Sequence, residues 1–291
     1  MNNEKYSYAI GESVTLGATA LDDVDGSVDC TYSGTVNNQI PGEYTIIYSA
    51  VDAAGNTATL SVIYIIYEPT DYLSMDLMSY YDDAEGLEGD SLVSSLRNIV
   101  SNYTYQSYDQ ARYILDETDA DPNNSNNVIL VYSQDSVSGV WDQGATWNRE
   151  HIWPQSYLPT SIMEADLHNL KPAYTSWNSS RGNKYYGNAL TTSTYLPNNQ
   201  VKGDIARILF YMVIRYEALE LTDNGNLIVA DSHYMGLLSV LLDWHYQDPV
   251  DDFERNRNEV IYTYQNNRNP FIDYEHFVEM IWKDHDYFLN A

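Results

Sequence analysis

The chain has 291 residues, and 42 Asp and Glu against 14 Lys and Arg give it a formal charge of −28, which argues against a general binder of polyanions. Hydrophobic residues make up 44% of the sequence, so the chain can bury a core, and wholesale disorder is excluded. The single cysteine, Cys30, excludes an intramolecular disulfide framework and a zinc finger with cysteine ligands.

Residues 6–67 have the pattern of an all-β region. Apolar side chains alternate along residues 58–66 with the period of two of a β-strand, and the intervening positions are also partly apolar, as in a sandwich. Pro41-Gly42 and Gly55-Asn56 are turn signals. Short strands separated by such turns predict an immunoglobulin-like sandwich, here without its disulfide.

Parts of this region resemble the bacterial Ig-like repeats of surface and secreted proteins. The resemblance is carried by residues 20–26, 41–45 and 51–56. It implies a spacer or an anchor with a ligand on the cell surface or wall. Residues 68–71 are typical of a linker, so we expect an Ig-like sandwich at 1–68 and a second domain at 69–291.

The second domain has the pattern of a mixed, largely helical domain. Apolar residues recur at helical spacing in segments that we predict as helices, at 90–101, 203–220, 234–244, 252–266 and 274–283. Asp90 is expected to cap the first of them. Residues 128–132 form a continuous apolar run, which indicates a buried strand. The predicted fold class is therefore α+β.

The residues that could carry chemistry lie between positions 147 and 183. Glu150 and His151 are adjacent there, and in a regular strand their side chains would point to opposite faces. Both can serve one site only if they lie at a strand end or in a distorted turn. Pro154, just after them, fits such an ending.

A second strand and a helix are expected to follow. Residues 165–171 are predicted as the strand, on which the side chains of Asp166 and His168 would share one face and have structural roles. Pro172 then suits the first turn of the helix. Asn178 and Arg181 are three residues apart and share a face of that helix. The predicted order is strand, loop, strand, helix.

These side chains fit a hard metal ion and a phosphate. The Glu150 carboxylate and the Asn178 amide carbonyl are hard oxygen donors, which suit Mg²⁺ or Ca²⁺ better than zinc. His151, with an ordinary pKa of about 6.5, can take a proton from an attacking water. Arg149 and Arg181 could hold a phosphate. Together they indicate hydrolysis of a phosphodiester.

The same segment closely resembles the ββα-metal (His-Me finger) site of the bacterial endonuclease I family. Further motifs of that family are matched at 202–207, 244–250, 254–258 and 265–273, and the match spans residues 72–285. The resemblance implies a sugar-nonspecific endonuclease that hydrolyses DNA, with RNA as a further candidate substrate, and leaves 5′-phosphates. It implies His151 as the general base. Glu150 and Asn178 would hold one divalent metal, usually Mg²⁺, with Mn²⁺ or Ca²⁺ as alternatives.

The sequence departs from part of the family at the phosphate clamp. Some members have a long insertion with a phosphate-binding arginine where this chain has residues 155–164, which contain no Arg or Lys. We therefore expect the clamp elsewhere, with Arg181 as the first candidate and Arg207 as the second. Arg149 completes the expected catalytic set.

The resemblance implies a protein that is secreted or held at the cell surface. The longest uncharged apolar stretch, 58–67, is half the length of about 20 residues that a membrane helix needs. The first residues contain no apolar segment of a signal peptide, so any secretion signal has been removed or never existed. No heptad pattern is present, and we expect a monomer.

Two readings from other classes stay open at this point. One is an adhesin-like binding protein on a nuclease scaffold that has lost activity, and metal-dependent turnover discriminates it from the nuclease. The other is a zinc protease, which residues 149–153 do not support, because they lack the helical His-Glu-x-x-His pair.

Overall fold

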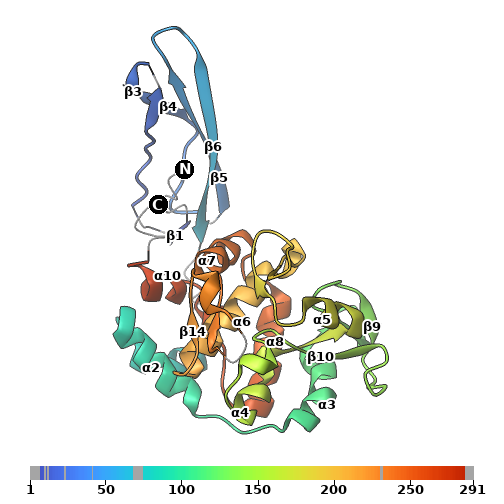
Figure 1. The fold of residues 1–291 in the computed structure, drawn as a ribbon. Coiled ribbons are helices and arrows are strands. Elements are labelled where there is room, and N and C mark those ends of the chain that lie inside the picture. Colours follow the sequence, from blue (N-terminus) through green and yellow to red (C-terminus); the bar gives the residue numbers. More distant parts are fainter. Residues whose placement is uncertain are drawn as a thin grey trace. The chain divides into compact units, whose positions relative to one another are not determined.

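The computed structural model describes residues 7–9, 11, 13–22, 24–40, 42–67, 75–229 and 232–285. The chain divides into two compact units, Met1–Leu77 with Phe288–Ala291, and Met78–Tyr287. The first is rich in strands and the second in helices (Figure 1), so the predicted α+β class is confirmed. The expected linker at 68–71 lies outside the described residues. None of the helices described here combines the length and the apolar character that a bilayer crossing requires.

The first unit is built around one sheet. Its strands are β1 (Ser7–Ala9), β2 (Ala20–Asp22), β3 (Gly26–Val28), β4 (Cys30–Ser33), β5 (Gly42–Val51) and β6 (Thr57–Tyr67). The sheet has the order β1-β6-β5-β4, in which β1 is parallel to β6 and the other pairs are antiparallel, while β2 and β3 pair separately. Apolar side chains on one face of this sheet, from β1, β5 and β6, form the core of the unit.

Alternation along β6 places only part of the expected set in that core. Val62, Tyr64 and Ile66 are buried, and they pack with other residues of the sheet: Tyr8, Ile46 and Tyr48. Leu60, expected on the same face, is 50% exposed. Cys30 is only partly buried. The core extends from the open end of the β5–β6 hairpin, at Ile66, to its middle, while Leu60 and Val51 nearer the turn are exposed.

The second unit has the following elements. Its α-helices, with α1 at the boundary between the units, are α1 (Met75–Tyr80), α2 (Gly89–Ser101), α3 (Tyr108–Thr118), α4 (Ser161–Glu164), α5 (Thr175–Arg181), α6 (Lys202–Arg215), α7 (Leu238–Gln247), α8 (Asp252–Gln265), α9 (Pro270–Asp273) and α10 (Phe277–Trp282). Its short 3₁₀ helices are η1 (Asp82–Ala84), η2 (Gln155–Tyr157), η3 (Leu167–Asn169), η4 (Asn199–Val201) and η5 (Gly225–Leu227). Its strands are β7 (Ala120–Asp121), β8 (Asn124–Ile129), β9 (Ser136–Ser138), β10 (Trp147–His151), β11 (Leu170–Tyr174), β12 (Tyr185–Tyr186), β13 (Thr194–Tyr195), β14 (Glu220–Leu221) and β15 (Tyr234–Met235).

The predicted helices are present, with different ends. Helix α2 begins at Gly89, and the residue at its cap is Glu88; Asp90 lies in the first turn, where its charge favours the positive end of the helix. Helix α6 ends at Arg215, and α7 begins only at Leu238, because residues 234–235 pair with β14. Helix α3 was not predicted, although Ser107 and Gln110 form a capping box at its start.

The second unit contains a ββα unit. Strands β10 and β11 are antiparallel, with Glu150 opposite Lys171 and His151 opposite Leu170, and α5 follows β11 directly. A buried cluster packs beneath the pair: Ala111, Ile114, Leu115, Val128, Leu130, Trp147, Leu167, Leu170 and Ile261. The apolar run at 128–132 leaves strand β8 at Ile129, and its last residues continue into this core as a buried loop.

The expected strand at 165–171 is wrong in its first half. Residues 167–169 form η3, and β11 begins only at Leu170. Side chains hold this turn in place of a strand partner: Asp166 accepts from the His168 backbone amide, and Arg257 donates to the carbonyl oxygens of Leu167 and Leu170. Asp166 and His168 are therefore structural, as expected, but they do not lie on a strand.

Pro172 is also placed differently from the prediction. It lies inside β11, opposite Arg149, and α5 begins three residues later at Thr175. Proline is tolerated here because the sheet has only two strands, so β11 has a free edge. The Pro172 carbonyl accepts from the backbone amide of Val131, which joins β11 to the loop after β8.

Candidate active site

Glu150 and His151 occupy the last two positions of β10. They therefore lie at a strand end, where the sequence predicted two adjacent residues that serve one site. Both side chains are buried, with exposed fractions of 1% and 6%. Helix α5 docks against this strand end at two points. Asn178 Nδ2 lies 3.4 Å from the backbone oxygen of Arg149, and Arg181 Nη1 lies 2.7 Å from that of His151. The ββα unit thus places Asn178 and Arg181 of α5 against the end of the strand that carries Glu150 and His151.

The Glu150 carboxylate is held by two donors on one of its oxygens. The Tyr132 hydroxyl donates to Oε1 at 2.6 Å, and Arg181 Nη1 lies 3.0 Å from the same atom. Burial raises the pKa of Glu150, and the Arg181 charge and the Tyr132 hydrogen bond act in the opposite direction. Both described contacts end on Oε1, and none of the contacts described here ends on Oε2.

His151 is oriented by a backbone carbonyl. Its Nε2 lies 2.9 Å from the oxygen of Glu164, at the end of α4, and its ring lies against that of Tyr108 with centroids 5.2 Å apart. A carbonyl can only accept, so Nε2 carries a proton, and Nδ1 is the nitrogen that can accept one. Burial lowers the pKa of His151 to about 4, which keeps the ring neutral at pH 7.

Buried neutral histidines predict a loss of stability in mild acid. Burial lowers the pKa of His151 and His168 to about 4, and it lowers the pKa of His245 well below its ordinary value. In the unfolded chain these groups titrate near 6.5. Between pH 4 and 6.5 the unfolded state therefore binds more protons, so this stability is complete above pH 6.5 and is lost as the pH falls.

The expected size of that loss is measurable. Three such groups lower the free energy of unfolding by roughly 3–4 kcal/mol between pH 7 and pH 5.5. Urea unfolding at the two pH values tests this. Most carboxylates titrate below that window, but burial raises the pKa of Glu254 to about 8, so this group acts in the opposite direction and the loss for the whole chain should be smaller than the sum for the histidines. A chain that is more stable at pH 5.5 than at pH 7 would contradict the neutral, buried state of these rings.

Asn178 uses its amide nitrogen to fix its own orientation. Nδ2 donates to Asn148 Oδ1 at 2.8 Å, besides its contact with the Arg149 carbonyl. With the nitrogen directed at β10, the side-chain oxygen is directed away from these partners and is free to act as a ligand. Asn178 is only partly buried, so water and a substrate can reach it.

The predicted arginines are placed very differently from one another. Arg181 is 1% exposed, and besides Glu150 it contacts the carbonyl oxygens of His151 and Ile152 and lies over the Tyr186 ring. This geometry favours a role in positioning Glu150 and the end of β10; its predicted contact with phosphate stays a prediction. Arg207 is fully buried and forms a two-point ion pair with Glu254, so it has no free face for phosphate.

Arg149 is partly buried beside the site. Its guanidinium stacks on the Tyr108 ring at 3.7 Å and donates to the Tyr108 backbone oxygen. Tyr108 therefore contacts both Arg149 and the His151 ring. This arrangement gives Arg149 a fixed position next to the candidate base, and its predicted contact with substrate stays a prediction.

Several residues that build the site carried no recognisable signal in the sequence. Tyr132 and Tyr186 surround the Glu150 carboxylate, and their hydroxyls lie 2.9 Å apart. Glu164 acts through its backbone, which no sequence pattern reports. Tyr132 ends an apolar run and was read only as part of a buried strand. The hydroxyl of Tyr132 at the end of this apolar run is the only feature of the sequence that indicates a buried hydrogen-bond donor there.

The donor set fits a hard, weakly chelated cation. The described residues contain no cluster of three or more His, Cys, Asp and Glu that could hold a metal. A metal at this site would rest on Glu150 Oε2 and the Asn178 oxygen, with water and phosphate in its other positions. Mg²⁺ is commonly bound in this way, by one or two protein oxygens, whereas zinc prefers three or four nitrogen and sulfur ligands.

Comparison with known proteins shows the family of the chain. The family model described as Endonuclease I matches residues 88–196 and 190–276, which span the whole ββα unit and more than half of the chain. The chain belongs to the endonuclease I family. The model of the Ig-like domain of bacterial surface proteins matches residues 10–61, within the first unit.

Relatives of this endonuclease I member carry a more specific name. A protein of Bacillus subtilis (strain 168) named extracellular ribonuclease is 42% identical over 254 residues, covering 79% of this chain and 86% of the relative. A protein of Bacillus amyloliquefaciens with the same name is 44% identical over 233 residues, covering 72% of this chain and 80% of the relative. Most of each relative is therefore represented in this chain.

Proposed function

We propose that this chain is an extracellular, metal-dependent endonuclease that hydrolyses phosphodiesters of both RNA and DNA and leaves 5′-phosphate ends. His151 is the general base, and Glu150 and Asn178 hold one divalent metal, Mg²⁺ in the first place, with Mn²⁺ and Ca²⁺ as alternatives. One observation carries the proposal: a neutral histidine with a fixed proton on Nε2 lies next to a buried carboxylate at the end of β10, with Asn178 docked beside them.

The geometry gives each residue a separate task. His151 accepts the proton of the attacking water on Nδ1, and the Glu164 carbonyl stabilises the imidazolium that results, because it already accepts from Nε2. Arg181 and Tyr132 hold Glu150 in its orientation through Oε1. Asn148 holds Asn178 through the amide nitrogen. When bound, the metal supplies positive charge that stabilises the phosphate in the transition state.

The substrate and the location rest on the relatives. Both named relatives are extracellular ribonucleases, so RNA belongs among the substrates, and secretion is the expected location. A general base and a metal act on the phosphate and on water, and neither group needs the 2′-hydroxyl of RNA. We therefore extend the activity to DNA. The Ig-like unit would act as a spacer or as an anchor to a ligand of the cell surface or wall.

Cleavage of matched RNA and DNA oligonucleotides tests the chemistry. We expect both to be cut in the presence of Mg²⁺, and the products to accept label only after phosphatase treatment of their 5′ ends. Products with 2′,3′-cyclic phosphate from RNA, together with intact DNA, would exclude the proposed mechanism, because they require attack by the 2′-hydroxyl. An absence of cleavage with every metal tried would favour the adhesin-like binding protein.

A further inference from the structure

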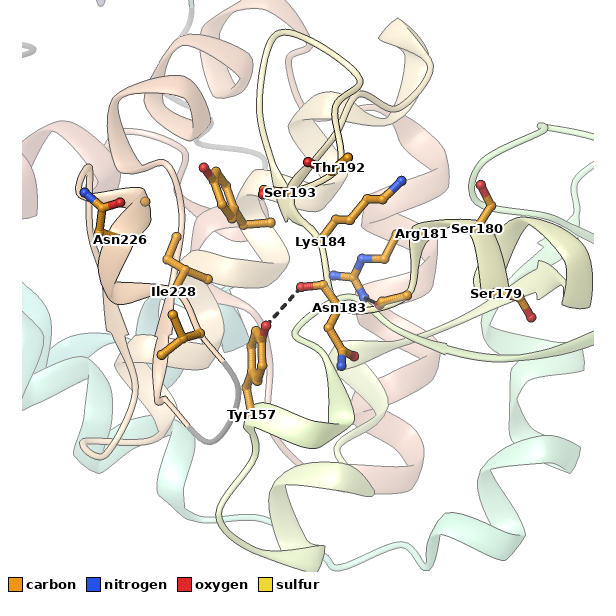
Figure 2. Close-up of a pocket in the computed structure, with 14 residues that line it drawn as sticks. Tyr157, Ser179, Ser180, Arg181, Asn183, Lys184, Thr192, Ser193, Asn226 and Ile228 are labelled. Atoms are coloured by element: carbon orange, nitrogen blue, oxygen red, sulfur yellow. Dashed lines mark hydrogen bonds between the residues drawn. The ribbon is translucent and has the colours of Figure 1, made fainter.

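A polar cavity of about 840 Å³ lies next to the candidate active site. Its volume is within the range of about 300–1,000 Å³ that is typical of small-molecule sites. Figure 2 shows Asn226 and Ile228 at the left, Tyr157 below, Thr192 and Ser193 above, and Asn183 and Lys184 near the centre of the view. Its walls come from the end of α5, the β12–β13 region and η5 with the residues after it.

The cavity and the candidate site share residues at the end of α5. Ser179, the first α5 residue in its wall, directly follows the predicted metal ligand Asn178. Arg181 belongs to both places, because it lines the cavity and also contacts Glu150 and the His151 carbonyl. A strand of nucleic acid with its scissile phosphate at Glu150 and Asn178 would therefore pass the cavity with an adjacent nucleotide.

The charge of the lining is unusual for this chain. The sequence contains 42 Asp and Glu, yet none of the described residues that line the cavity is acidic. The two charged side chains among them are Arg181 and Lys184. Arg181 is buried and engaged with Glu150 and backbone oxygens, so Lys184, which is only partly buried, is the cation that can meet a ligand. An acid-free cavity with one available lysine selects an anion.

The uncharged lining suits the rest of a nucleotide. Tyr157 and Tyr185 supply aromatic surface, and Asn183 and Asn226 supply amide donors and acceptors. The Tyr157 hydroxyl donates to the Asn183 backbone oxygen at 3.2 Å, which fixes this wall. Gly225 lets Tyr185 approach closely, since a Cβ there would lie 2.5 Å from the Tyr185 hydroxyl.

We propose that this cavity is a subsite for one nucleotide of the substrate strand, next to the scissile phosphate, and that Lys184 binds a phosphate of that nucleotide. The inference rests on the proposed nuclease function and deepens it. It would supply the phosphate contact that residues 155–164 lack, since Arg207 is buried in its pair with Glu254 and Arg181 is held by Glu150 and backbone oxygens. A nucleotide unstacked from its neighbours fits such a cavity, so single strands are the preferred substrate.

Steady-state cleavage of a short single-stranded RNA by the full chain with Mg²⁺ tests the subsite. Lys184→Gln should raise KM about tenfold, as expected for the loss of one charge-assisted contact, and leave kcat within twofold. The dependence of log(kcat/KM) on log[NaCl] should become shallower by about 0.7, the value for one phosphate contact on a single strand. Lys184→Arg should restore KM to within twofold of the wild type.

Two further variants make the outcome specific. Lys283→Gln removes an exposed lysine that pairs with Glu88 and does not line the cavity, and it should leave KM unchanged. Asn226→Asp introduces a carboxylate of nearly the same shape into the acid-free wall and should raise KM in the same direction as Lys184→Gln. Circular dichroism of each variant shows whether it has folded.

The outcomes separate this inference from the proposed function. A wild-type chain that cleaves no nucleic acid removes the nuclease function itself. A wild-type chain that cleaves, together with a KM for Lys184→Gln equal to that of the wild type, removes only the subsite. Equal rises in KM for the Lys184 and Lys283 variants, or a loss confined to kcat, would likewise overturn it, because they indicate a general charge effect or a role outside substrate binding.

Discussion

Replacing His151 with alanine is expected to lower kcat for phosphodiester cleavage by about 10³-fold, within the range of about 10²–10⁴-fold that a general base contributes. The ring is neutral at pH 7, its proton lies on Nε2 towards Glu164, and Nδ1 is left to accept the proton of water. Since binding of substrate does not use this nitrogen, KM should change little. Initial rates on a labelled oligonucleotide at saturating Mg²⁺ measure both parameters.

His233→Ala is the matched control for this experiment. His233 is exposed and lies just before β15, outside the candidate site, so its removal should leave kcat within twofold. The His151 variant loses its bond to Glu164, so its thermal unfolding is measured beside that of the wild type. A folded His151→Ala chain that retains a tenth or more of the wild-type kcat would show that another group accepts the proton.

Glu150→Gln is expected to lower the rate of cleavage about as much as His151→Ala does, and also to lower the stability of the fold. The amide keeps the shape but removes the charge that attracts the metal, so cleavage should fall by about 10³-fold and the metal needed for half-maximal rate should rise by at least 100-fold. The substitution also leaves the Arg181 guanidinium buried without its carboxylate. The free energy of unfolding should fall by about 3–5 kcal/mol.

Two other variants bracket that result. Tyr132→Phe removes the hydroxyl that donates to Oε1 but keeps the carboxylate and its pair with Arg181, so the metal requirement should rise only about tenfold. Glu217→Gln, at an exposed position, should change neither property. Titration of each variant with Mg²⁺ and Mn²⁺ gives the metal requirement, and urea unfolding gives the stability. A Glu150→Gln chain with a wild-type metal requirement would exclude Glu150 as a ligand.

The positions of several candidate site residues could be predicted from the sequence, because they depend on the spacing of near neighbours. Adjacent Glu150 and His151 demanded a strand end, and the structure places them in the last two positions of β10. The spacing of Asn178 and Arg181 required one helical face, and both residues on α5 contact the end of that strand. These are relations between near neighbours, which backbone geometry fixes without reference to the rest of the chain.

Contacts between distant segments were beyond such reasoning. Tyr132 lies 18 residues before Glu150 and Tyr186 lies 34 residues after Ile152, and their meeting depends on how loops pass over the ββα unit. The turn at 167–169 is helical because Arg257, about 90 residues away, binds its carbonyl oxygens. The alternation of residues 165–171 predicts a strand, because a local pattern cannot show that a side chain so far along the chain binds this backbone.

The same limit applies to the arginines. A guanidinium near a catalytic motif suggests phosphate binding, but Arg181 and Arg207 are buried and paired with Glu150 and Glu254. Burial depends on the packing of α5 and α6, which the sequence indicates only as apolar stripes. Lys184, in contrast, lies in no sequence motif that suggests a role. Its proposed role in phosphate binding follows from its position in a cavity that has no acidic residue among its described lining.

Metal-dependent cleavage of supercoiled plasmid and of a labelled RNA by the purified wild-type chain is the decisive test of the proposed nuclease function. We expect nicking and then degradation of the plasmid and cutting of the RNA with Mg²⁺, both abolished by EDTA and restored by an excess of Mg²⁺. Cleavage that continues unchanged in EDTA would contradict the assignment of Glu150 and Asn178 as metal ligands. Plasmid and RNA that stay intact with Mg²⁺, Mn²⁺ and Ca²⁺ would contradict the nuclease function as a whole.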